Sequence, residues 1–91
     1  MSVVEGRGLT FRQRIDMGLT VPNMLRVARE MKRNGELSDD ADVAAAQIAA
    51  ALAGENPKAF ADPSIDWDAI LAFIEKLLPL ILQIISIFSA I

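Results

Sequence analysis

Four cations on one predicted helix are the side chains whose spacing best fits a binding site. Arg26, Arg29 and Arg33 recur at i, i+3 and i+7, and Lys32 lies beside them, so all four gather on one helix face. Such a stripe suits phosphate groups, whether these belong to nucleic acid or to anionic lipid. The stripe is therefore a candidate contact for an acidic partner. The alternative is a solvated helix face on which Glu30 pairs locally with its neighbours.

The carboxylates are arranged for helix capping rather than for metal binding. Asp39, Asp40 and Asp42 follow Ser38 closely, but the glycine and the distant glutamate of an EF-hand loop are missing. The helix dipole favours negative charge in a first turn, so capping explains these residues. The chain contains no Cys and no His, which excludes metal sites built on those ligands, iron–sulfur clusters, haem, and Ser–His or Cys–His catalysis. We expect no metal, no cofactor and no enzymatic activity.

Charged and apolar residues are segregated along the 91-residue chain. Residues 1–33 carry a local charge of +4, residues 34–76 carry −7 and residues 77–91 carry none, which gives the net charge of −3. Apolar residues make up 53% of the chain. That is a heavy load for a length at which one domain buries only ~60–65% of its unfolded surface. The first residues lack the apolar core of a signal peptide, so we do not expect secretion by that route.

Capping signals predict an all-α fold with three short N-terminal helices and one long apolar C-terminal helix. Thr10 and Gln13 form a capping box for the first helix. Thr20 precedes Pro22, a proline that is tolerated in the first turn of the second helix. Ser38 is the predicted cap of the third helix. The expected helices occupy, in chain order, residues 10–18, 21–34, 38–53 and 64–91.

Glycine and proline residues predict where these helices end. Gly18, Gly35 and Gly54 each follow a helical run and are expected to stop one helix. Two prolines mark a linker, and Asp62-Pro63-Ser64 opens the last helix. The expected parts of the chain are an extended N-terminal arm, a small helical region, a linker and the apolar helix, at residues 1–9, 10–53, 54–63 and 64–91.

The last helix carries large apolar residues in a heptad repeat. Spacings of 4 and 3 alternate from Ile70 to Ile91 and place residues at position d (Ile70, Leu77, Ile84, Ile91) and position a (Ile74, Ile81, Phe88) in turn. The flanking positions are also large and apolar, at e (Leu71, Leu78, Ile85) and at g (Phe73, Leu80, Ile87), and polar residues occur only at b, c and f. Pro79 lies at f, on the outer face. The predicted oligomer or partner interface comprises Ile70, Phe73, Ile74, Leu77, Leu78, Leu80, Ile81, Ile84, Ile85, Phe88 and Ile91.

This heptad pattern favours an assembly of several copies. A dimeric coiled coil has charged e and g positions that solvate its flanks, and isoleucine-rich a and d layers favour more than two strands. We therefore expect the fold to be completed by a homo-oligomer of three or more copies, or by docking onto other subunits of a larger assembly. Replacement of Ile81 by Asp is expected to break such an oligomer.

Two other environments for the last helix stay open. In the first, it is the centre of a monomeric bundle, with half of its apolar arc covered by Phe11, Ile15, Met17, Leu19, Met24, Leu25, Val27, Met31, Val43, Ile48 and Leu52. In the second, it contacts or enters a membrane. The uncharged run 77–91 is short for a span, and a longer span from Ala69 would include Glu75 and Lys76. Trp67 would then anchor at the membrane interface, or else at a protein seam or in the core.

The sequence thus predicts a non-enzymatic structural or assembly protein, a small helical subunit that oligomerises or docks through its C-terminal helix. Cys-free chains that hide apolar surface only in an assembly are common among bacteriophage coat, connector and internal proteins. By that analogy we expect a virion component, located in a virion or in the host cytoplasm. The first alternative is a holin-like or pore-forming protein that inserts its last helix into a membrane. The second is a helix-turn-helix DNA-binding protein, which the turn between the first two helices suggests and the acidity of the chain opposes.

Overall fold

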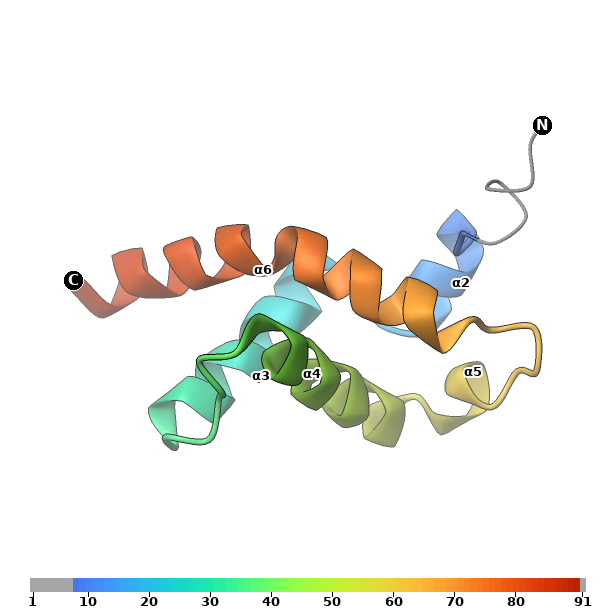
Figure 1. Cartoon of the computed structure of the whole chain (residues 1–91), viewed down its shortest axis with the longest axis horizontal. Coiled ribbons are helices and arrows are strands. Elements are labelled where there is room, and N and C mark those ends of the chain that lie inside the picture. The colour runs from blue at the N-terminus through green and yellow to red at the C-terminus, as the bar shows by residue number, and fades with distance from the viewer. Residues whose placement is uncertain (1–7, 91) are drawn as a thin grey trace.

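The computed structural model describes residues 8–90, so the predicted arm over residues 1–9 lies almost wholly outside this range. The described part is helical and contains no strand, which confirms the all-α prediction. Figure 1 shows the long last helix lying across the others, with its C-terminal end reaching beyond them. The helices are α2 (Phe11–Asp16), α3 (Val21–Arg33), α4 (Ala41–Glu55), α5 (Pro57–Phe60) and α6 (Trp67–Ala90).

The caps predicted for α2 and α3 are observed, although α2 is shorter than the predicted range 10–18. The Thr10 hydroxyl accepts a hydrogen bond from the Gln13 amide at 3.0 Å, and the Gln13 side chain accepts one from the Thr10 amide at 2.9 Å. The Thr20 hydroxyl caps α3 in a similar way, at 3.4 Å from an amide of the first turn. Gly18 and Gly35 follow these two helices with φ angles of 75° and 72°, a backbone conformation that strongly favours glycine.

Both ends of α4 differ from the prediction. The helix begins at Ala41, because Asp40 rather than Ser38 accepts the amides of the first turn, at 2.9 and 3.3 Å. The Ser38 hydroxyl accepts a hydrogen bond from the Asp40 amide at 3.0 Å and so stabilises the turn that precedes the helix. At the other end, α4 continues through Gly54 to Glu55. The predicted linker is therefore shorter, and it contains the helix α5.

The start of α6 lies at Trp67 instead of Ser64. The Asp62 carboxylate accepts hydrogen bonds from the amide and the hydroxyl of Ser64, at 2.9 and 2.8 Å. The Asp66 carboxylate then accepts the Asp68 amide at 2.9 Å. Local side-chain hydrogen bonds of this type stabilise a turn in competition with the helix. This explains why α6 begins only after Asp66.

The core is one stripe of α6 packed against α3 and α4. Ile70, Ile74, Leu78, Ile81 and Ile85 follow one another at spacings of 4, 4, 3 and 4, and none is more than 3% exposed. The buried residues of α4 are mainly small, so α6 can approach closely while its large side chains fill the space. The other elements supply Met17, Leu19, Met24, Val27, Ala28, Ala44, Ala45, Ile48, Ala49 and Leu52.

This core is completed within one chain, as the monomeric alternative requires. Five of the eleven residues predicted at an interface form the buried stripe of α6, where the same chain covers them. Three residues expected to cover α6 remain exposed: Phe11 by 72%, Ile15 by 49% and Val43 by 47%. The reason is that α2 has only six residues and buries none of them, and that Val43 lies in the first turn of α4.

Replacement of Ile81 by Ala is expected to lower the free energy of unfolding by about 2–5 kcal/mol, because the side chain is fully buried and leaves a cavity. Leu82 is the matched control, since it is the next residue of α6 and is 37% exposed. Leu82→Ala should cost about 1 kcal/mol or less. Urea unfolding followed by circular dichroism measures both values, and equal losses would show that the core is assigned to the incorrect face of α6.

Candidate functional site

A second apolar stripe on α6 remains outside the core. Phe73, Leu77, Leu80, Ile84 and Ile87 follow one another at spacings of 4, 3, 4 and 3 along one flank of the helix. Leu80 is 46% and Ile87 is 56% exposed, and the other three are partly buried. We call these five residues the outer seam. All five belong to the predicted interface, and their spacing is that of a helix face that packs against another helix.

The short helix α2 lies beside the N-terminal end of the outer seam. The Arg14 guanidinium lies 5.4 Å from the centre of the Phe73 ring and 6.0 Å from that of Phe11, and it donates a hydrogen bond to the Leu9 carbonyl at 3.1 Å. Cation–π contacts of this kind attract a guanidinium to both rings. The exposed Phe11 ring of α2 therefore lies near the N-terminal end of the outer seam, with Arg14 in contact with both rings. No sequence signal could reveal this contact, because Arg14 and Phe73 are far apart along the chain.

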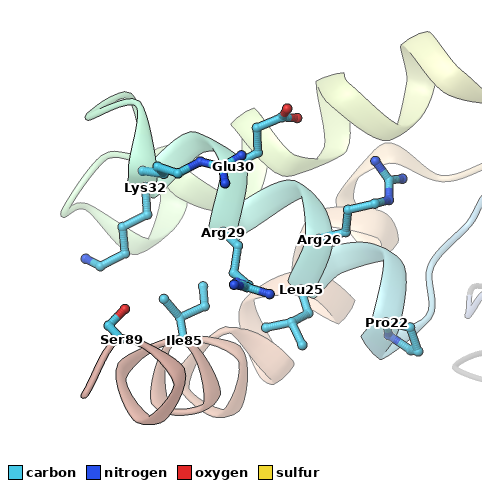
Figure 2. Close-up of a pocket in the computed structure, with 9 residues that line it drawn as sticks. Pro22, Leu25, Arg26, Arg29, Glu30, Lys32, Ile85 and Ser89 are labelled. Atoms are coloured by element: carbon cyan, nitrogen blue, oxygen red, sulfur yellow. The ribbon is translucent and has the colours of Figure 1, made fainter. Parts of the chain in front are cut away.

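A basic groove of about 680 Å³ lies between α3 and the last turns of α6 (Figure 2). Arg29 and Lys32 extend from α3 toward α6, where Leu25 and Ile85 face each other as an apolar wall. The Arg29 guanidinium also lies 5.2 Å from the centre of the Phe88 ring. The groove thus joins cations of the predicted basic stripe to residues of the predicted interface. All four predicted cations contribute to its lining: Arg26, Arg29, Lys32 and Arg33.

The structure separates Arg26 from the other cations of the stripe. Its guanidinium points away from α6 and donates two hydrogen bonds to the Glu55 carboxylate, at 2.6 and 3.0 Å. These hydrogen bonds raise the pKa of Arg26 and lower that of Glu55. Because both side chains are about half exposed, the ion pair adds little to stability. The ion pair does neutralise Arg26, one of the four cations predicted to contact an acidic partner.

Three carboxylates gather where the start of α4 meets the middle of α6. Asp40 is engaged in capping α4. A hydrogen bond shared with Asp42, together with burial and the charges of Asp42 and Asp40, raises the pKa of Glu75. Among residues 8–90, no three side chains of His, Cys, Asp or Glu are placed to hold a metal ion.

By length and composition alone, α6 could cross a membrane. Residues 67–89 have a mean hydropathy of 2.1, and 28% of the most apolar window is buried inside the chain. The core helix of a soluble protein passes the same test, so this is weak evidence.

The two ends of α6 hold the remaining predicted residues. Trp67 is 45% exposed, and its ring packs edge-to-face on Phe60 of α5 with the centres 6.2 Å apart. Trp67 therefore joins the start of α6 to the short helix before it and is not a core residue. Ile91 of the predicted interface lies outside the described residues.

Replacement of Glu75 by Gln is expected to raise the melting temperature at neutral pH. Since the pKa of Glu75 is raised above its ordinary value of 4.5, the folded chain holds the proton more tightly than the unfolded chain. The stabilisation this provides at acidic pH is lost as the pH rises through the raised pKa. Glutamine removes the charge beside Asp42 at every pH, so the variant should lose that part of the pH dependence.

Thermal unfolding across the acidic-to-neutral range measures this difference. Glu36→Gln is the control, because Glu36 is an exposed carboxylate in the loop before α4. A Glu75→Gln variant that melts at or below the wild-type temperature at neutral pH would disprove the repulsion between Glu75 and Asp42.

The structure therefore presents two surfaces suited to contact, the outer seam and the basic groove. Each contains residues that the sequence singled out, and each adjoins a second helix. No protein-family model, curated protein or solved structure matches the chain.

Proposed function

We propose that the chain is a non-enzymatic structural protein, a small helical subunit that binds further copies of itself through the outer seam. The observation that carries this proposal is a second apolar stripe on α6 that α3 and α4 do not fully bury: Leu80 and Ile87 are exposed, and Phe73, Leu77 and Ile84 are partly buried. Burial of such surface is favourable, and contiguous exposed apolar surface is a mark of interaction sites.

A second copy fits the outer seam because the seam is complementary to itself. It extends over ~21 Å of helix and consists only of large apolar side chains. In an isologous contact, each seam residue would enter the space between seam residues of the facing helix. Phe11 and Ile15, exposed on the neighbouring α2, would widen the contact beyond α6.

The burial of the e positions changes the size of assembly that we propose. From the sequence, free apolar flanks at both e and g favoured three or more copies. In the structure, Leu78 and Ile85 at e belong to the core, so the flank with d and g is the one left for a neighbour. One flank accommodates one facing helix, and a dimer is therefore the smallest assembly that satisfies the seam.

Membrane insertion of α6 is a second candidate function, which its mean hydropathy of 2.1 favours. A spanning α6 would have to leave the core, because α3 and α4 cover its buried stripe. It would also carry Glu75 and Lys76 into the hydrocarbon, which is costly. Light scattering with and without detergent separates the two functions, since an oligomer built on the seam needs no detergent to stay in solution.

Replacement of Leu80 by Asp is expected to raise the dissociation constant of the oligomer by at least about tenfold, which corresponds to ~1.4 kcal/mol. The reason is that the contact would bury an unpaired charge. Leu82→Asp is the matched control, because it is the same change two residues along α6 on a flank outside the seam. Sedimentation equilibrium of the wild type and both variants measures the constant.

The fold of the Leu80→Asp variant is checked by its circular dichroism spectrum. Ile81→Asp, which the heptad suggested as the test, is unsuitable because Ile81 is fully buried in the core of the single chain. A charge there would unfold the chain whether or not it assembles. A wild-type chain that stays monomeric at every concentration, or a Leu80→Asp variant of unchanged mass, would contradict the proposed self-association.

A further inference from the structure

We propose that the basic groove binds the phosphate headgroup of an anionic phospholipid and so attaches the chain to a membrane surface without insertion of α6. This goes beyond the proposed self-association, because it uses another surface and another kind of partner. Three features carry it: cations without a carboxylate partner, an apolar wall beside them, and exposed apolar side chains next to the groove.

The cations of the groove are available for an anion. Among residues 8–90, Arg29, Lys32 and Arg33 form no ion pair, in contrast to Arg26, which is held by Glu55. Figure 2 shows Arg29 and Lys32 directed toward α6. The one acidic residue of the lining, Glu30, points away from the groove in the same view. A phosphate between α3 and α6 would therefore meet positive charge.

The other half of the groove is apolar. Leu25 and Ile85 form its wall, and Ser89 offers a hydroxyl on the α6 side below Lys32. Phe88, which is 50% exposed, lies against Arg29 and adjoins the groove. Basic side chains beside exposed aliphatic and aromatic groups are the composition of helices that lie at a membrane interface.

This combination favours a lipid over free phosphate or another small anion. A free anion would use the cations and leave the partly buried Leu25 and the exposed Phe88 ring without an apolar partner. A phospholipid satisfies both halves, since its phosphate meets Arg29 and Lys32 while the adjoining hydrocarbon boundary receives Phe88.

The net charge of the chain is negative, which helps to distinguish binding at the groove from a general attraction to anionic surfaces. At −3, the chain as a whole is not drawn to an anionic surface, so attachment must depend on the local groove. Removing two cations from the groove must therefore weaken binding more than removing two cations elsewhere, although both changes alter the net charge equally.

The test is co-sedimentation of the full chain with phosphatidylcholine vesicles, with and without phosphatidylglycerol. The groove variant is Arg29→Gln with Lys32→Gln. The charge-matched control is Arg12→Gln with Lys58→Gln, which changes α2 and α5 at the opposite end of the molecule (Figure 1). Phe88→Ser tests the apolar half at constant charge, and calorimetry with inorganic phosphate tests the free ion. Circular dichroism confirms that each variant is folded.

We expect the wild type to bind only the vesicles that contain phosphatidylglycerol. The groove variant should lose binding by about tenfold or more, the control by about twofold or less, and Phe88→Ser should bind several-fold more weakly. Equal losses in the two charge-matched variants, or equal binding to neutral vesicles, would overturn the proposal. Full binding by Phe88→Ser, or inorganic phosphate bound as tightly as vesicles, would overturn the assignment to a lipid.

Discussion

The packing of one stripe of α6 against α3 and α4 is the contact on which the rest of the structure depends. Residues 8–90 contain one long helix with large apolar side chains around most of its circumference, and two other helices longer than six residues to cover it. α4 can approach closely because three of its five buried residues are alanines, Ala44, Ala45 and Ala49, while Ile48 and Leu52 fill the remaining space in the core. In a short chain, this burial supplies the main favourable free energy of folding.

Polar contacts then set the orientation of the covering helices. The Asn56 side chain at the end of α4 donates hydrogen bonds to the Met17 and Leu52 carbonyls, at 3.3 and 3.1 Å. Gly18 makes room for this amide, because a Cβ there would lie 3.0 Å from its nitrogen. The turn before α3 is thereby joined to α4, which holds α3 where Arg29 extends over the end of α6. The core, the outer seam and the basic groove thus all depend on how α3 and α4 are placed against α6.

Local signals predicted the start of a helix well where one capping residue stood alone, and poorly where several competed. Thr10 has no rival as the cap of its helix, and its capping box is observed. Ser38 and Asp40 both suit an N-cap, and the choice between them was not visible in the sequence. The candidate site was predictable to the same extent, since the cations were recognised as a group. The ion pair between Arg26 and Glu55 was not predictable, because it depends on a contact between separate helices.

The sequence by itself determined the all-α class, the N-terminal caps of α2 and α3, and the apolar character of the last helix, because these depend on residues only a few positions apart. Only the tertiary structure decided which face of α6 is core. The heptad pointed to a and d, but Leu78 and Ile85 at e are buried, while Leu77 and Ile84 at d remain on the outer seam. Helical periodicity shows which residues share a face. Which face of α6 is buried depends on how α3 and α4 pack against it, and this is set by the small residues of α4 and by the length of α3.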